Sequence, residues 1–196
     1  NIVIVLGAVA TALLEPMFYF RQPPGLRDLN RCFSPPFNDD QGQLAQAILN
    51  HIRAARPEAV IDLHNTSGSS PAFAVTVGDS REQRSLVSFF VHHLMVTDLK
   101  LGSIMEQDLG CPVVTIEAGG SLDESAERVA SGGIERYFNA VDVLNSQGKL
   151  ELFHHPLRLE LCEHSRIDYA ERALHDRDIT VRADIEKFND APLREA

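Results

Sequence analysis

The chain has 196 residues, of which 44% are hydrophobic and 23% charged, a composition typical of a soluble globular domain, alone or with a small appendage. It has 28 acidic and 18 basic residues and a formal net charge of −10. This balance argues against sequence-independent binding to nucleic acid, because such binding needs basic patches. A local arginine cluster could still bind an anionic small molecule.

The three cysteines, Cys32, Cys111 and Cys162, are widely spaced and form no CxxC pair. This spacing argues against a disulfide framework or a thiolate zinc site and favours a reduced, cytoplasmic setting. Residues 1–12 are apolar, but they lack the basic start of a signal peptide and are shorter than the roughly 20 residues of a membrane span. We therefore expect no membrane segment and no membrane partner.

Up to residue 147 the pattern of apolar residues predicts strands that alternate with helices. Buried strands are expected at residues 2–7, 59–63, 72–77 and 112–116. Helices are expected at residues 8–15 and 44–55, and after capping-box sequences at residues 80–83 and 121–124. Such alternation is typical of an α/β protein with a parallel or mixed sheet.

Beyond Gly148 the pattern changes. Apolar residues alternate with charged ones around residues 157–161 and 179–185, and no helical period separates the two stretches. A period of two predicts a small antiparallel β unit. We therefore place a domain boundary near residue 148, between a unit of residues 1–147 and a β-rich unit of residues 148–196.

His64 ends a short apolar strand and is followed by a loop of small polar residues. In α/β proteins ligands gather at the carboxyl ends of strands, and a neutral imidazole is the commonest metal ligand. Asp62 lies two positions earlier on the same strand face, where its carboxylate could orient the imidazole. The alternative is a hydrogen-bonded core histidine without a metal, with Asp62 bonded to backbone groups.

Asn30 and Arg31 lie in a loop that begins after a Pro-Pro-Gly sequence and also carries Arg27. The planar guanidinium of an arginine suits a carboxylate, and an asparagine amide beside it adds a donor and an acceptor. We expect Asp28 to hold one of the arginines in place. The alternative is that this charged pair is ordinary solvated surface.

Glu117 ends a run of five apolar or β-branched residues, so its backbone is expected to be buried. A carboxylate is costly in such a place unless it has a function, and the Ala118-Gly119-Gly120 sequence after it permits close approach of a ligand. Glu117 is therefore the candidate for catalysis. The alternative is a glutamate that caps a helix or forms an ion pair.

Three segments resemble the succinylglutamate desuccinylase/aspartoacylase family, whose members are relatives of the zinc carboxypeptidases. They are Asp28-Leu29-Asn30-Arg31 with Phe33, Asp62-Leu63-His64-Asn65-Thr66, and Ile116-Glu117-Ala118-Gly119. Their order and spacing agree with the family. The resemblance implies a three-layer α/β/α sandwich of the zinc-carboxypeptidase type with a small C-terminal β unit.

The resemblance also implies a zinc-dependent amidohydrolase that deacylates an N-acyl amino acid. His64 would be a ligand of Zn²⁺, Asn30 and Arg31 would bind the carboxylate of the substrate, and Glu117 would be the general base and acid. The expected partner is this small-molecule substrate, and a homo-oligomer is compatible with the interpretation.

The sequence departs from the family at two places. The family has two more zinc ligands in a His-Gly-x-Glu element just after its first strand, but here Gly7 is followed by Ala-Val-Ala-Thr. Either segments are missing from this sequence after Gly7 and between Glu15 and Pro23, or the chain truly lacks the element and would not bind zinc. In addition, Gln107 stands where aspartoacylases carry a substrate-binding arginine, which argues against N-acetylaspartate as the substrate.

Two further interpretations stay open from the sequence. A metallocarboxypeptidase that acts on peptides would have a wide substrate cleft in place of a closed pocket. A metal-free carboxylate-binding protein of the same fold would keep the Asn30–Arg31 pair without catalysis.

Overall fold

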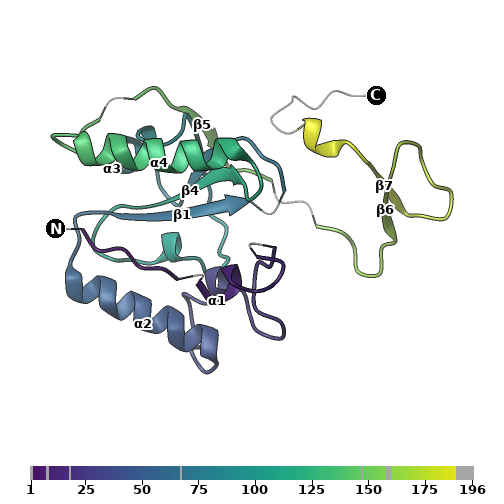
Figure 1. The fold of residues 1–196 in the computed structure, drawn as a ribbon, viewed down its shortest axis with the longest axis horizontal. Coiled ribbons are helices and arrows are strands. Elements are labelled where there is room, and N and C mark those ends of the chain that lie inside the picture. The colour runs from purple at the N-terminus through teal and green to yellow at the C-terminus, as the bar shows by residue number, and fades with distance from the viewer. Residues whose placement is uncertain are drawn as a thin grey trace.

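The computed structural model describes residues 2–7, 9–17, 19–66, 68–146, 148–157 and 160–188. Five strands form one mixed sheet in the order β1-β4-β2-β3-β5 (Figure 1). Within this sheet β2 is antiparallel to β4, whereas the pairs β1/β4, β2/β3 and β3/β5 are parallel. The strands are β1 (Val60–Thr66), β2 (Phe73–Thr76), β3 (His93–Val96), β4 (Val113–Gly120) and β5 (Glu151–His154).

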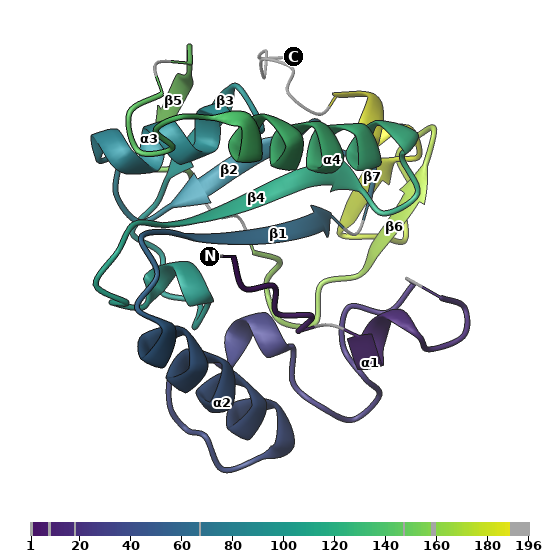
Figure 2. The same cartoon turned by 60° about the vertical axis from the view of Figure 1, so that its left-hand side comes forward.

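Helices cover both faces of this sheet. Helices α3 (Arg81–Ser88) and α4 (Glu124–Asn139) lie on one face, and α2 (Asp40–Ala55) lies on the other side of the sheet (Figures 1 and 2). The four-residue helix α1 (Val9–Ala12) and the short 3₁₀ turns η1 (Leu29–Arg31) and η2 (Ile104–Glu106) complete this part of the chain. The arrangement confirms the predicted three-layer α/β class. Among the described residues, no helix combines the length and the hydropathy needed to cross a membrane.

Two apolar clusters fill the two sides of the sheet. The larger cluster joins α3 to the sheet and includes the fully buried Leu86, Leu94 and Ile116. Phe89 at the end of α3 contacts Tyr137 of α4 edge to face, with ring centroids 5.8 Å apart, which ties the two helices together. The smaller cluster joins α2 to the η1 and η2 turns and is built from Cys32, Phe33, Ala45, Ile48, Leu49 and Ile104.

The helix ends test the predicted caps. The capping box at residues 80–83 is confirmed, because the Ser80 hydroxyl accepts from the Gln83 amide and the Gln83 side chain accepts from the Ser80 amide. The box predicted at residues 121–124 is wrong, since α4 begins after Asp123. The Asp123 carboxylate instead accepts from the backbone amide of Gly120 and is used to hold the end of β4.

The strand predicted at residues 2–7 is wrong. Residues 2–6 form irregular chain, and their side chains are 46–76% exposed. A strand needs a hydrogen-bonded neighbour as well as an apolar sequence. Among the described residues, β1 forms a ladder with β4 alone. The first place where we expect a segment to be missing follows Gly7, and the next residue, Ala8, lies outside the described residues.

The C-terminal region forms a small β unit of β6 (Ile167–Ala170) and β7 (Ile179–Arg182), followed by the 3₁₀ turn η3 (Ile185–Phe188). The antiparallel pairing predicted here is wrong, because β6 and β7 are parallel. The backbone amides of Asp178 and Ile179 both donate to the carbonyl of Arg166, so β7 starts beside the start of β6. The alternation of apolar and charged residues within a strand does not show whether its neighbour runs parallel or antiparallel to it. The boundary at residue 148 stays a prediction, while β5, which follows it, belongs to the five-stranded sheet.

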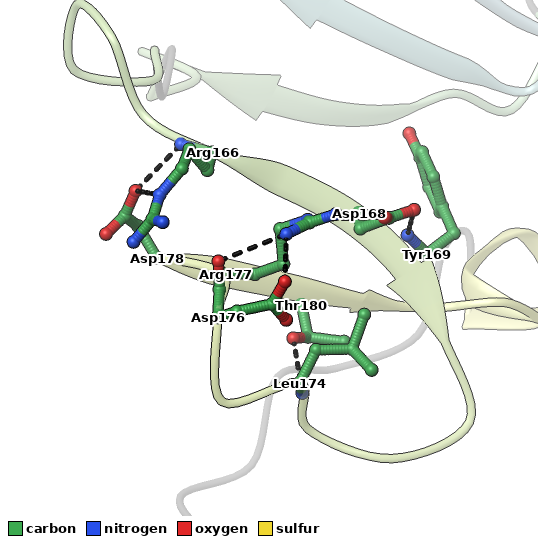
Figure 3. A network of polar contacts seen from close by, with 8 residues as sticks. All are labelled: Arg166, Asp168, Tyr169, Leu174, Asp176, Arg177, Asp178 and Thr180. Carbon is green, nitrogen blue, oxygen red and sulfur yellow. Dashed lines mark hydrogen bonds and ion pairs between the residues drawn. The ribbon is translucent and has the colours of Figure 1, made fainter.

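Ion pairs surround the β6–β7 ladder (Figure 3). Arg166 contacts Asp178 at 3.3 Å, and Arg177 contacts Asp168 at 3.3 Å and also Asp176. Among the described residues, every buried apolar side chain lies before residue 127. The ladder is therefore held by its backbone and by these surface charges.

Candidate active site

The site begins with the pairing of β1 and β4. These neighbouring parallel strands are in a register that places His64 directly beside Glu117, and Asp62 beside Thr115. Paired residues of neighbouring strands point to the same face of a sheet. The two predicted site residues therefore lie side by side, near the carboxyl ends of both strands. A β-bulge interrupts the register immediately after His64, a feature that often re-aims side chains next to functional sites.

Asp62 orients the imidazole of His64, as predicted from their spacing. The Nε2 atom of His64 lies 2.9 Å from Asp62 Oδ2, which also accepts a hydrogen bond from the Thr115 hydroxyl at 3.2 Å. When Nε2–H donates to Asp62, the lone pair of Nδ1 is left to accept a proton or bind a ligand. Burial alone would lower the pKa of His64, but the hydrogen bond to Asp62 and the nearby carboxylates of Glu117 and Asp28 raise it overall.

Glu117 carries a half-buried carboxyl group. Its burial raises its pKa above the ordinary value, against the opposing charges of His64, Arg21 and Arg31. Its Oε2 atom is buried and has no hydrogen-bond partner among the described residues. A buried oxygen without a partner is expensive unless a ligand supplies the missing donor. Glu117 is thus suited to take up and release a proton.

Asn30 and Arg31 form the η1 turn, which Asp28 holds in place. The Asp28 carboxylate accepts a hydrogen bond from the Asn30 amide at 2.9 Å, and its carbonyl accepts from the buried Cys32 thiol at 3.1 Å. The Arg31 guanidinium donates to the Asn30 carbonyl at 2.7 Å. Asn30 Oδ1 is the second buried side-chain oxygen that lacks a partner among the described residues. The pair is therefore a structured turn and not merely solvated surface.

Arg21 is a site residue that the sequence analysis did not single out. Its Nε atom lies 2.6 Å from Asp28 Oδ2, so Asp28 does hold an arginine, as expected. The arginine nearest in sequence, Arg27, instead forms a two-pronged ion pair with Asp39, the N-cap residue of α2. The charges of Arg21 and Arg31 both act on Glu117. The sequence indicates that Asp28 pairs with an arginine, but which arginine it pairs with depends on the fold of the loop.

The structure thus brings together the three segments that the sequence singled out. The imidazole of His64 and the carboxylates of Glu117 and Asp28 interact electrostatically, as do Glu117 and Arg31. A proton-accepting carboxyl group and the cationic Arg31 of the η1 turn therefore lie within electrostatic range of one another. This arrangement can bind an anionic ligand and transfer a proton beside it.

A cavity of about 510 Å³ lies where the chain leaves the carboxyl ends of β1 and β4, and its lining residues include neither His64 nor Glu117. Its walls come from the loop after β1 and the start of α4, including Ser69 and Asp123, and from Glu186 of η3. The views agree that the β6–β7 unit lies beyond the carboxyl ends of β1 and β4 (Figures 1 and 2). The C-terminal region therefore supplies one wall of this cavity through Glu186.

The donor set does not by itself fit a catalytic zinc ion. Such a site needs three protein ligands, and the described residues contain no group of three His, Cys, Asp or Glu side chains arranged to hold a metal. His64 offers one ring nitrogen, while its other nitrogen is bonded to Asp62.

Gln107 lies at the end of η2, where its side-chain amide donates to the Ser34 hydroxyl at 3.1 Å. It therefore braces the loop after Arg31 with a neutral side chain. A carboxylate of a substrate would meet no positive charge from this position. The expectation against N-acetylaspartate stays a prediction.

Comparison with known proteins identifies the fold. No protein-family profile and no curated protein matches the chain. Several solved structures do. The succinylglutamate desuccinylase from Chromobacterium violaceum aligns with a TM-score of 0.54 at 17% identity, over 71% of this chain and 55% of that chain. A desuccinylase from a Silicibacter species aligns with a TM-score of 0.52 at 14% identity, over 68% and 46%. The Vibrio cholerae enzyme gives 0.50 at 14% identity, over 74% and 47%.

The chain therefore has the fold of succinylglutamate desuccinylases, and several of its structural neighbours belong to the family that its sequence motifs resemble. The chain spans about half the length of these solved proteins. At such low identity the likeness establishes the fold, while the chemistry rests on the site.

Proposed function

We propose that this chain is a hydrolase that deacylates N-acyl amino acids. The observation that carries the proposal is the pairing of His64 with Glu117, whose half-buried carboxyl group has a raised pKa and a buried oxygen without a partner among the described residues. The charge of Arg31 acts on Glu117, and the Asn30–Arg31 pair suits the carboxylate of the substrate. The fold shared with desuccinylases supports the same class of reaction.

In this mechanism Glu117 moves one proton. Asn30 and Arg31 bind the carboxylate of the substrate and so place its amide bond beside Glu117. Glu117 takes a proton from water as the water oxygen attacks the amide carbon, and it then gives that proton to the nitrogen as the carbon–nitrogen bond breaks. The products are a free carboxylic acid and an amino acid.

Zinc remains a proposal, with His64 as one of its ligands. A stable site would need two further protein ligands. Metal analysis of protein purified without chelator tests it: about one zinc per chain, lowered in His64→Ala, would support the proposal, and protein without zinc would favour the metal-free candidate below. Cytoplasmic location and assembly into a homo-oligomer also stay predictions.

The decisive experiment compares two glutamate variants on a panel of N-succinyl and N-acetyl amino acids, with peptides included because a carboxypeptidase would cleave them. Glu117→Gln should lower kcat by about 10²- to 10⁴-fold, because the amide cannot accept the proton. Glu135→Gln is the matched control, since Glu135 is an exposed residue of α4 and does not line the cavity described above. Near-normal turnover in Glu117→Gln would return Glu117 to a structural role.

A metal-free carboxylate-binding protein is the second candidate. The observation in its favour is that His64 is bonded to Asp62 and that the described residues supply no three-ligand metal group around it. Such a protein would bind N-acyl amino acids through Asn30 and Arg31 without releasing the amine. Calorimetric binding without turnover, in protein supplied with zinc, would favour this candidate.

A further inference from the structure

The loop of residues 101–107 lies against the Asn30–Arg31 turn and has no role in the mechanism above. It contains the η2 turn, and one of its side chains, Ile104, is buried in the apolar cluster that includes Cys32, next to Arg31 in the chain, and residues of α2. It therefore connects the anion-binding turn to the core of the protein.

Glu106 ties this loop into one conformation. Its Oε1 atom accepts hydrogen bonds from the amides of Leu101 and Ser103 and from the Ser103 hydroxyl, at 2.8–3.0 Å, and its Oε2 atom accepts from the Gly102 amide at 3.1 Å. Burial raises the pKa of Glu106, but these hydrogen bonds outweigh it and lower the pKa overall. Three consecutive backbone amides are thus fixed by one side chain.

Gly102 links this ordered loop to the backbone around Arg31. Its carbonyl accepts a hydrogen bond from the Phe33 amide at 2.9 Å, and its φ angle of +81° lies in the left-handed region. A Cβ atom at this position would lie 2.7 Å from the carbonyl oxygen of Arg31 and 3.1 Å from its carbonyl carbon. The backbone of Arg31 can lie this close only because residue 102 has no side chain.

The Asn30–Arg31 turn depends on such outside support. A 3₁₀ turn of three residues has too few internal hydrogen bonds to fix its own direction. Asp28 holds its start, and the loop of residues 101–107 holds its end through Gly102 and through the bond from Gln107 to Ser34. A shift of about 1 Å in such a turn is enough to spoil a positioned contact.

We propose that Gly102 and Glu106 are positioning residues that set the grip of Arg31 on the carboxylate of the substrate. The inference rests on the proposed function for the identity of the ligand. Neither residue touches the reacting bond. Their effect should fall on the recognition of the carboxylate and leave the other contacts of the substrate unchanged.

The test measures binding of an N-acyl amino acid and of its carboxamide analogue by calorimetry, in the Glu117→Gln background to prevent turnover. A charge-assisted contact to the carboxylate is worth about 10- to 150-fold in affinity. Gly102→Ala should lower the ratio of the affinity for the carboxylate ligand to that for the carboxamide by about tenfold or more, and Arg31→Ala should do the same. Glu106→Gln should reduce the preference in the same direction, because it weakens the loop without adding a clash.

Gly110→Ala is the matched control. Gly110 also has a left-handed φ, +72°, but an added Cβ would meet no atom within 4 Å. This variant carries the same backbone strain without pressing on Arg31, so its preference for the carboxylate should be that of the parent. Equal losses in the two glycine variants, or equal weakening of both ligands by Gly102→Ala, would overturn the inference.

The proposed function can fail separately. If the unmutated protein binds the carboxylate ligand, prefers it over the carboxamide and hydrolyses neither, the hydrolase proposal fails while the positioning role stands. If Glu117→Gln without a further substitution binds the carboxylate ligand and its carboxamide analogue equally well, the positioning role is overturned as well. Should Gly102→Ala fail to fold, Glu106→Gln decides the question with the same two ligands.

Discussion

The five-stranded sheet and the β6–β7 unit are both built from short strands, but different interactions hold them. The sheet is covered by helices, and its core includes side chains with no exposed surface, such as Leu94 and Ile116. In the β6–β7 unit, Ile167 and Ile179 are 37% and 40% exposed, and arginine–aspartate pairs take the place of a core. Apolar burial is worth several kcal/mol per large side chain, whereas an exposed ion pair is worth about 0–1 kcal/mol. We therefore expect the two regions to differ in stability and in their response to salt.

The largest expected effect is in the core of the sheet. Leu94→Ala should lower the free energy of unfolding by about 2–5 kcal/mol, because it leaves a cavity among fully buried neighbours. Urea denaturation followed by far-UV circular dichroism measures this loss. Leu157→Ala, at a side chain that is 91% exposed in the connection to the β6–β7 unit, should change stability by less than about 0.5 kcal/mol. Similar losses in both variants would break the distinction between the regions.

A second test compares one arginine–aspartate pair from each region. Arg27 donates to Asp39, which also caps α2 through the Gly42 amide, and these bonds lower the pKa of Asp39 to about 2 from the ordinary 3.8. Since the folded-state pKa is lowered, the stabilisation is complete above about pH 4 and is lost as the pH falls towards 2. Asp39→Asn should therefore be less stable than the parent at pH 5, and the difference should shrink by pH 2.

Asp178 provides the control for this test. Hydrogen bonds from Arg166 lower its pKa as well, but it lies in the β6–β7 unit. Asp178→Asn should leave the unfolding midpoint of the main sheet unchanged at both pH values. A pH-independent difference for Asp39→Asn would mean that the cap does not depend on its charge.

The smallest expected effect is in the β6–β7 unit itself. Arg177→Ala removes the contacts to Asp168 and Asp176 and should cost at most about 1 kcal/mol of local stability. Amide hydrogen exchange at Asp168 and Val181 measures it, and 1 M salt should abolish most of the difference because it screens exposed charges. Arg128→Ala, which breaks an exposed pair with Glu124 on α4, is the matched variant in the covered region. Loss of protection in β4 on mutating Arg177 would show that the two regions unfold together.

The elements that the sequence predicted correctly are those in which local pattern and tertiary contact agree. The helix predicted at residues 44–55 lies within α2, where Ile48 is buried as its period predicts, and the capping box at Ser80 begins α3. Residues 2–6 have an equally clear apolar pattern, but pattern alone cannot supply the neighbouring strand that a ladder requires. The parallel direction of β7 depends on the path of the chain after Ala170. An apolar residue at every second position gives no information about that path.

The candidate site follows the same division. His64 and Glu117 could be found from the sequence because each follows a largely apolar run at a strand end, and the structure pairs them. Arg21 could not be assigned, because its distance to Asp28 is set by the fold of the loop between them. The support of Arg31 by Gly102 comes from a segment about 70 positions further along the chain, and nothing local to either residue reveals it.

The register of β1 against β4 also has a consequence for how the protein folds. Asp62 and Thr115, which are bonded to each other, are 53 positions apart in the chain. The loop between them must close before the imidazole of His64 meets Glu117, and contacts of such long range form slowly because the entropy of closure is lost before any contact compensates for it. During refolding the helices should therefore form first, and the ability to bind a ligand should return only with the last, cooperative assembly of the sheet.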